Sequence, residues 1–151
     1  MDINTCTTMT KKPRGLRNNN PGNIRKGGVP YQGEIVPSKD DAFRQFTTMA
    51  YGYRAMFVVL HTYQRKYGIS TIADMIIRYA PAIENHTTKY IRAVSEASGV
   101  PATSHITTTN GDVMIPIVSA MSKVENGVPA ELSEVEQGWK LFIEDYRAHK
   151  V

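Results

Sequence analysis

Cysteine is almost absent from this sequence of 151 residues, in which Cys6 has no second cysteine to pair with. A disulfide within the chain is therefore excluded, and the chain is long enough to rely on one hydrophobic core instead. No apolar run approaches the roughly 20 residues of a membrane-spanning helix, and the first residues lack the apolar core of a signal peptide. We expect synthesis to end in the cytoplasm unless other proteins export the product.

Several catalytic signatures are also missing. The histidines do not show the His-Glu-x-x-His spacing of a zinc site; they are His61, His86, His105 and His149. There is no Gly-x-Ser-x-Gly nucleophile elbow, and no glycine-rich phosphate loop is followed by Lys-Ser or Lys-Thr. The sequence therefore predicts neither a metal nor a cofactor.

The charge is mildly unbalanced, because 18 Lys and Arg residues against 14 Asp and Glu residues leave a formal net charge of +4. Much of the excess lies near the N-terminus, at Lys11, Lys12, Arg14, Arg17, Arg25 and Lys26. Such a bias favours an anionic polymer, for which a bacterial cell wall and a nucleic acid are both candidates. Because few aromatic residues are interleaved with these cations and no known nucleic-acid motif occurs, nucleic acid is the less favoured partner.

An asparagine-rich segment between residues 14 and 25, RGLRNNNPGNIR, is the most distinctive part of the chain. Asparagine tolerates a left-handed backbone, proline fixes one dihedral angle and glycine permits positive φ, so the segment predicts a turn. Amide side chains also pair well with the hydroxyl and acetamido groups of sugars. Two interpretations stay open: the amides brace the turn, or they face a ligand.

The order of the remaining segments predicts one α+β domain that is mainly helical. Residues 1–13 are polar and are expected to form a loose arm, and residues 14–151 are expected to form the domain. Glycine and proline divide residues 26–46 into short extended pieces, which predicts a small irregular β-hairpin region. About five helices are expected to follow, near residues 47–67, 71–79, 87–98, 112–126 and from 133 onward.

Local signals predict where some of these helices begin and end. Thr47 or Thr48 is expected to cap the first helix, whose apolar stripe stops before Gly68. Pro116 has to lie in the first turn of the fourth helix to be tolerated there. Residues 133–136, Ser-Glu-Val-Glu, match a capping box that begins the last helix.

The loop after the second expected helix carries the best candidate for acid–base chemistry. It places Glu84 beside Asn85 and His86, between two helices. A glutamate in a partly apolar pocket has a raised pKa and can act as a general acid. The alternative is structural, because a carboxylate here stabilises the start of the next helix through its dipole by about 0.3–1 kcal/mol.

A glycosidase normally needs a second carboxylate, about 5–5.5 Å from the first for retention of configuration and about 6.5–9.5 Å for inversion. Glu34, Asp40 and Asp41 in the hairpin region are the candidates, although Asp41 equally fits a turn cap. A lytic transglycosylase manages with a single glutamate, because a hydroxyl group of the substrate completes the reaction.

The sequence resembles a group of small phage and prophage proteins that are described as virion structural or endolysin-like proteins. The likeness covers about residues 14–100, and its most specific block is RGLRNNNPGNIR. The other matching segments are Tyr31-Gln32-Gly33, Asp41-Ala42-Phe43 with Phe46, Tyr51-Gly52-Tyr53-Arg54-Ala55, Thr62-Tyr63-Gln64, Tyr79-Ala80-Pro81, Glu84-Asn85, Thr87 and Tyr90. This resemblance implies a phage protein that is made in the host cytoplasm and then acts at the periplasm or cell wall, or in the virion.

A looser resemblance links the chain to bacterial glucosaminidases of the lysozyme-like superfamily. Those enzymes have an asparagine turn, a hairpin and a Phe-x-x-Phe/Tyr piece leading into a helix, and Asn18–Ile24 and Phe43–Phe46 follow that order. Their catalytic glutamate ends a helix upstream of the asparagine turn. Here Asp2 is the only acid in the 17 residues before Asn18, so another acid has to take the role.

Together these resemblances imply a lysozyme-like domain that cleaves the glycan strand of peptidoglycan, as an endolysin or a virion-associated lysin. Glu84 is the expected general acid, with Asp41 or Glu34 as its helper. The expected substrate-binding residues are Asn18, Asn20, Asn23, Arg25, Gln32, Arg54, Asn85 and Tyr90. The alternative is a non-catalytic virion protein that binds the cell wall or other virion proteins.

Overall fold

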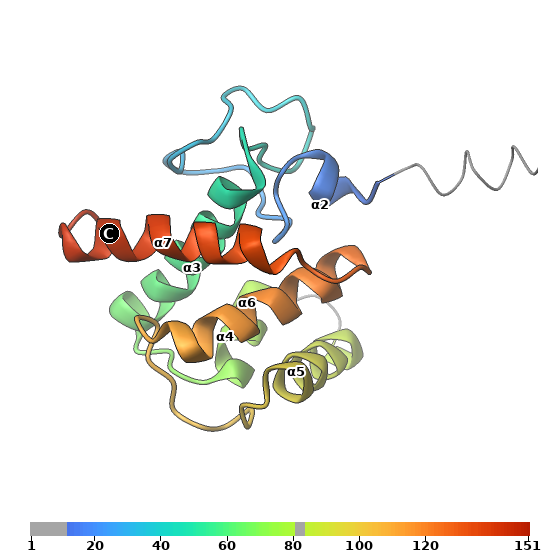
Figure 1. Cartoon of the computed structure of the whole chain (residues 1–151). Helices are drawn as coiled ribbons and strands as arrows, with labels where there is room; N and C mark the ends of the chain where they lie inside the picture. The colour runs from blue at the N-terminus through green and yellow to red at the C-terminus, as the bar shows by residue number, and fades with distance from the viewer. Residues whose placement is uncertain (1–11, 81–83) are drawn as a thin grey trace, which may run out of the picture.

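Six helices make up most of the chain that the computed structural model describes, residues 12–80 and 84–151. They are α2 (Arg14–Arg17), α3 (Met49–Tyr67), α4 (Ile72–Tyr79), α5 (Glu84–Ser98), α6 (Gly111–Asn126) and α7 (Leu132–Arg147), as labelled in Figure 1. The predicted single, mainly helical domain is confirmed. The expected loose arm, residues 1–13, falls largely outside the described residues.

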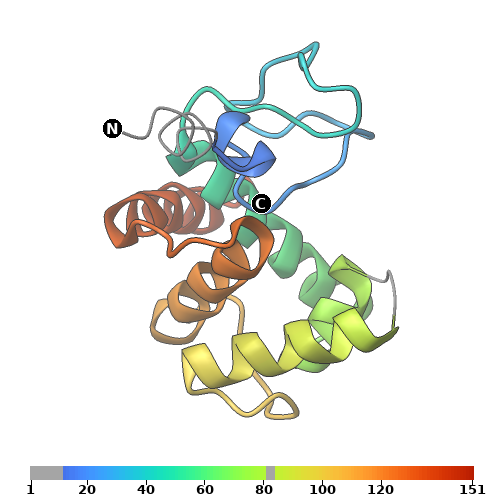
Figure 2. The same cartoon turned by 90° about the vertical axis from the view of Figure 1, so that its right-hand side faces the viewer.

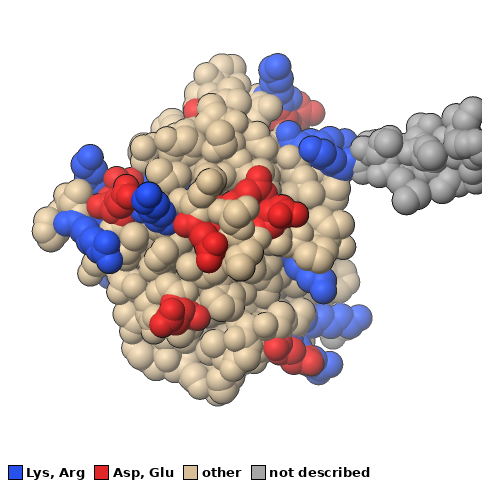
Figure 3. Space-filling view, in the orientation of Figure 1, with Lys and Arg blue, Asp and Glu red and all other residues tan. Residues whose placement is uncertain are grey.

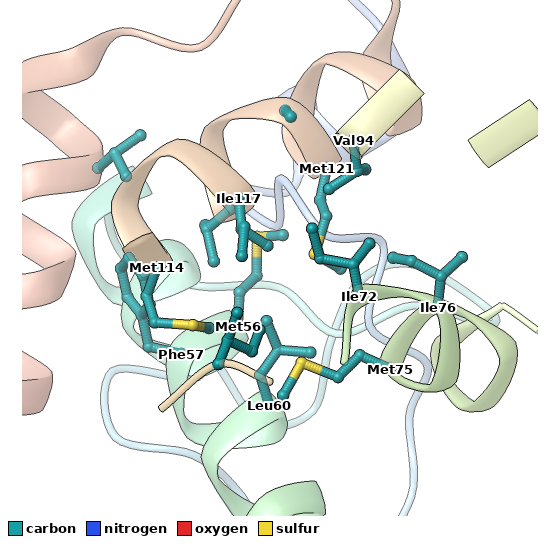
Figure 4. Packing of buried hydrophobic residues seen from close by; sticks show 14 of the residues in the cluster. Met56, Phe57, Leu60, Ile72, Met75, Ile76, Val94, Met114, Ile117 and Met121 are labelled. Carbon is teal, nitrogen blue, oxygen red and sulfur yellow. The ribbon is translucent and has the colours of Figure 1, made fainter. Parts of the chain in front are cut away.

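Helix α3 runs through the centre of the domain and supplies the largest share of the core. Its Met56, Phe57 and Leu60 are fully buried against side chains from α4, α5 and α6. Figure 4 shows these contacts, in which sulfur and branched aliphatic groups interlock; the labelled partners are Ile72, Met75, Ile76, Val94, Met114, Ile117 and Met121. The predicted apolar stripe of α3 is therefore confirmed, except at its last residue, Tyr67, which is 53% exposed.

Helices α3 and α7 pack most closely where α7 carries Gly138. A Cβ atom at that position would lie 2.6 Å from Cβ of Tyr53, so the two helices approach too closely for any larger residue. An ion pair fastens the same interface further along, since Arg54 of α3 donates to Asp145 of α7 at 2.8 Å. Helix α7 thus packs along one side of α3, and residues of α4, α5 and α6 share the hydrophobic core with α3 (Figure 1).

Two helix boundaries follow the local signals well. The hydroxyl of Thr48 accepts a hydrogen bond from the backbone N–H of Tyr51, which confirms a threonine cap at the start of α3. Gly68 ends α3 in the left-handed conformation, with φ of 65°. Helix α5 begins at Glu84, three residues before its predicted start.

Two other local predictions are wrong. Helix α6 begins at Gly111 behind the capping residue Asn110, so Pro116 is its sixth residue and lies beyond the first turn, where it removes one helical hydrogen bond. Helix α7 begins at Leu132, and its N-cap Glu131 makes no side-chain capping bond. Ser133 therefore lies inside the helix, and the expected capping box does not form.

The predicted hairpin region is an irregular loop with very little strand. Within the described residues it contains two isolated antiparallel bridges, Arg25 with Phe43 and Glu34 with Phe46. Glycines with positive φ, including Gly27 and Gly33, interrupt the extended pieces before a ladder can form. Figure 2 shows this loop lying over one end of α3, while α4 and α5 lie at the other end.

The guanidinium of Arg44 holds this loop together from inside. It is 5% exposed and donates to the backbone carbonyls of Arg25, Gly27 and Val29. It also forms an ion pair with Glu34 at 2.5 Å. A buried cation thus satisfies the carbonyl groups that a regular sheet would otherwise pair.

The asparagine segment begins with the short helix α2, which the sequence did not predict, and then forms the predicted turn. Asn19 and Asn23 both adopt the left-handed conformation, with φ of 50° and 49°. Asn20 is fully buried, and its amide group donates to the carbonyls of Ile24 and Arg44 and accepts from the N–H of Ile24. The amide of Asn20 therefore crosslinks the turn to the loop above it.

The turn is also fixed from below by two helices. Gly52 of α3 lies so close to the carbonyl of Asn19 that a Cβ atom would collide with it. From α6, the amide of Asn126 donates to the carbonyl of Pro21 at 2.8 Å. The turn is thus held between the start of α3 and the end of α6.

None of the helices in residues 12–80 and 84–151 is both long enough and apolar enough to cross a lipid bilayer.

We predict that Asn20→Asp lowers the free energy of unfolding by about 3 kcal/mol, because a carboxylate oxygen would face two carbonyl groups that now receive hydrogen bonds. Urea unfolding followed by circular dichroism measures the change. The matched control is Asn110→Asp at the α6 N-cap, where aspartate caps as well as asparagine. A loss at position 20 no larger than at position 110 would contradict the crosslinking role of Asn20.

Candidate functional site

Glu125, in the last turn of α6, has a carboxyl group that bonds to two distant segments of the chain. Asn23 of the turn donates its amide N–H to Oε1 at 3.0 Å, and the hydroxyl of Tyr90 on α5 donates to Oε2 at 2.9 Å. The side chain is half-buried, so part of it still meets solvent. Three segments that are distant in sequence therefore converge on this group.

The surroundings of Glu125 favour its protonated form. Burial raises the pKa of this carboxyl above its ordinary value, and the hydrogen bonds from Asn23 and Tyr90 offset only part of that rise. Its place at the C-terminal end of α6 acts in the same direction, because the negative end of the helix dipole disfavours a negative charge. A glutamate with a raised pKa is suited to donating a proton near neutral pH.

A cavity of about 450 Å³ lies between the loop region and helices α3 and α4. Its lining is rich in phenol, guanidinium and amide groups, which can bond to a polar ligand; the residues are Asn23, Ile24, Arg25, Tyr31, Arg44, Val59, Tyr63 and Tyr79. Asn23 is common to the cavity and to the Glu125 cluster, since its side chain lines the former and bonds to the latter. Asn23 therefore connects the cavity to the carboxyl group of Glu125.

Tyr79 supports the same wall. Its hydroxyl donates to the carbonyl of Gly22 at 2.6 Å, which ties the end of α4 to the asparagine turn. Burial and then the charge of Glu125 raise the pKa of Tyr79 well above its usual value, so its phenol stays protonated and serves as a donor.

The three asparagines expected to bind substrate differ in what their amides contact. The amide of Asn18 donates to Asp40 at 3.0 Å, and that of Asn20 bonds to the backbone, so both are used within the protein. Asn23 alone of the three lines the cavity. Bracing therefore accounts for Asn18 and Asn20; the amide of Asn23 also bonds within the protein, to Glu125, and Asn23 differs from the other two in lining the cavity.

The remaining expected binding residues are dispersed. Arg25 lines the cavity, with its guanidinium 4.9 Å from the ring centroid of Phe43. Gln32 is exposed on the loop. Arg54 is buried in its ion pair with Asp145 of α7 and does not line the cavity. Tyr90 is 7% exposed and reaches Glu125.

The expected carboxylates are also placed differently from one another. Glu34 is paired with Arg44 and accepts the N–H of Tyr31, and Asp41 is exposed. Glu84 is the first residue of α5, but its side chain and that of Asn85 lie outside what the structure describes. The roles assigned to these residues from the sequence stay predictions.

Asp40 has a structural role in the loop. It accepts hydrogen bonds from Arg14, from Asn18 and from the backbone N–H groups of Ala42 and Phe43. The Arg14 guanidinium and these other donors hold the pKa of the Asp40 carboxyl far below its ordinary value. A permanently ionised carboxylate cannot act as a general acid.

Glu125 was not among the candidates from sequence, although one local signal marks it. An acidic residue in the last turn of a helix opposes the helix dipole, and Glu125 stands directly before the Asn126-Gly127 stop of α6. Its partners Asn23 and Tyr90 are 102 and 35 positions away, so only folding reveals the cluster.

No family model matches the sequence. One curated relative, Protein P5 of Pseudoalteromonas phage PM2, is 37% identical over 138 residues, an alignment that covers 89% of this chain and 84% of the relative. The chain belongs to the Protein P5 family. It is therefore a phage-type protein, and the name of its relative specifies no reaction or ligand.

Neither the face shown in Figure 3 nor the metal-binding side chains of the described residues add to the candidate site of this P5 family protein. On the face shown in Figure 3, acidic and basic side chains are interspersed, so this face offers no continuous basic track. Within residues 12–80 and 84–151, no group of three or more His, Cys, Asp or Glu residues is arranged to hold a metal ion.

We predict that Tyr90→Phe raises the pKa of Glu125 further, because the lost hydroxyl now stabilises the ionised carboxylate. NMR titration of the glutamate side-chain carboxyl carbons measures this pKa, which in the parent should already exceed the value of about 4.3 for a free glutamate. Tyr146→Phe on α7 is the control, since its ring packs on His61 and not on Glu125. An unchanged or lower pKa in Tyr90→Phe would show that the hydroxyl does not donate to Glu125.

Proposed function

We propose that this P5 family protein is a phage-type lysin that cleaves the glycan strand of peptidoglycan, with Glu125 as the general acid. The observation that carries the proposal is the contact between Glu125 and Asn23, at the wall of a cavity lined by polar and aromatic groups. In the lysozyme-like glucosaminidases that the sequence resembles, the catalytic glutamate ends a helix upstream of an asparagine turn. Glu125 ends α6 beside such a turn, although it comes later in the chain.

Cleavage of the glycosidic bond begins with one proton transfer. Protonated Glu125 donates its proton to the glycosidic oxygen as the bond from that oxygen to the anomeric carbon breaks. If a hydroxyl group of the same sugar then attacks, its proton returns to the Glu125 carboxylate and an anhydro sugar is released. If water attacks, a second carboxylate assists, and Asp41 and Glu34 remain the candidates for that role.

The cavity walls supply the contacts that would hold a sugar chain. Amide, phenol and guanidinium groups bond to hydroxyl and acetamido groups, and the faces of tyrosine rings pack on the apolar faces of pyranose rings. Asn23, Arg25 and Tyr63 present these groups in the cavity. Gln32, Asn85 and Arg54 remain expected contacts from the sequence, and their role in binding is part of the proposal.

We predict that Glu125→Gln lowers the rate of cell-wall clearance at least about 100-fold, the smaller end of the contribution of a positioned general acid. The parent should also lose activity as the pH rises through the pKa of Glu125, because the reaction uses the protonated carboxyl. Turbidity of peptidoglycan suspensions gives the rate, and mass spectrometry of the products distinguishes anhydro ends from reducing ends.

The matched control is Glu84→Gln, which makes the same chemical change at the acid favoured by the sequence. We expect Glu84→Gln to keep most of the activity. A parent-like rate for Glu125→Gln, together with an inactive Glu84→Gln, would transfer the role of general acid to Glu84.

A second candidate function is a non-catalytic virion component that binds the cell wall or other virion proteins. It is favoured by the observation that the amides of Asn18, Asn19 and Asn20 bond to the protein itself. A zymogram on purified peptidoglycan separates the two functions, since a structural component leaves no cleared band. As a lysin the protein would act in the periplasm or cell wall after synthesis in the host cytoplasm, and as a structural component it would remain in the virion.

A further inference from the structure

A second and more open cavity, of about 710 Å³, adjoins the one described above. It is lined by Tyr63, Ile69, Asp74, Ile77 and Arg78. Tyr63 lines both cavities, so they are neighbours at this residue. A polymer that enters the first cavity can therefore continue into the second along α3 and α4.

The second cavity presents a cation, Arg78, that forms none of the ion pairs found among the described residues, although Asp74, one turn earlier on α4, lines the same cavity. Arg78 is exposed, and its guanidinium lies 3.8 Å from the ring centroid of Tyr67 and 5.4 Å from that of Tyr63. It takes part in none of the ion pairs found in residues 12–80 and 84–151. By contrast, Arg44 in the first cavity is already neutralised by Glu34.

Apolar surface surrounds this cation. Tyr67 is 53% exposed and Ile77 is 51% exposed, although both stand on helices whose other apolar residues are largely buried. Stacking of Arg78 on two tyrosines would by itself fasten α3 to α4, and this is the structural alternative. Fastening α3 to α4 in this way does not require Ile77 to be exposed to solvent. It also does not require the guanidinium group of Arg78 to lack an ion-pair partner.

We infer that Arg78, Tyr67 and Ile77 form an outer subsite for a peptide-bearing sugar of the peptidoglycan strand. The guanidinium of Arg78 binds a carboxylate of the peptide, and Tyr67 and Ile77 pack on the sugar ring. This inference rests on the proposed function, because it takes the strand in the first cavity to continue past Tyr63. Planar guanidinium groups bind carboxylates through two parallel hydrogen bonds, which suits an acidic substituent better than a neutral sugar.

The test is a binding measurement on the full chain that does not depend on cleavage. All variants carry Glu125→Gln, so that the strand stays intact, and sedimentation with purified peptidoglycan gives the affinity. We expect Arg78→Gln and Tyr67→Ala each to weaken binding by about fivefold to tenfold, the size of one exposed charged or stacking contact. Arg147→Ala on α7, which lines neither cavity, should bind as the Glu125→Gln background does.

A second substrate tests the assigned carboxylate. On strands whose peptide carboxyl groups have been converted to amides, Arg78→Gln should bind as tightly as the background, whereas Tyr67→Ala should remain weaker. Thermal unfolding midpoints confirm that each variant is folded, and Ile77→Ser replaces Tyr67→Ala if that variant unfolds.

The outcomes separate the two proposals. If the parent cleaves peptidoglycan but Arg78→Gln and Tyr67→Ala bind as the background does, the subsite is overturned and the lysin function stands. Equal weakening of Arg78→Gln on untreated and amidated strands overturns the assignment of the carboxylate. If the parent does not cleave peptidoglycan and the Glu125→Gln background does not bind it, both proposals are overturned.

Discussion

One hydrogen bond, from the amide of Asn23 to the carboxyl group of Glu125, joins two parts of the chain that are 102 positions apart. The rest of the candidate site depends on it, because Asn23 also lines the cavity between the loop and α3. The bond requires a left-handed residue at 23 and a helix that ends at Asn126. Asn126 then secures the same contact by donating to the carbonyl of Pro21.

The pKa of Glu125 is set by two opposing effects. Burial disfavours its charge and raises its pKa, while Asn23 and Tyr90 stabilise the charge by hydrogen bonding. Asp40 shows the opposite balance, since Arg14 and backbone donors outweigh its desolvation and lower its pKa. Two carboxyl groups that bond to the same asparagine segment are thus suited to different tasks: Asp40 braces the loop, and Glu125 can hold a proton.

Predictions from sequence succeeded where the deciding interactions are short in range. The Thr48 cap, the Gly68 stop and the left-handed asparagines depend on contacts within a few residues. The capping box at Ser133 and the first-turn position of Pro116 failed, because α7 begins at Leu132 without a side-chain cap and α6 begins at Gly111, behind the capping side chain of Asn110. The predicted β-hairpin does not form for another reason. The buried side chain of Arg44 donates to carbonyl groups that neighbouring strands would otherwise have paired.

By itself, the sequence determined that the protein is mainly helical, that a turn rich in amides precedes the helices, and that no disulfide stabilises it. Its likeness to phage proteins agrees with its membership of the Protein P5 family. Only the tertiary structure decided which acid meets the turn, since Glu125 and Tyr90 approach Asn23 through the packing of α5 and α6. Local patterns encode the propensity of a segment, whereas the neighbours and pKa of a side chain arise from segments that only folding brings together.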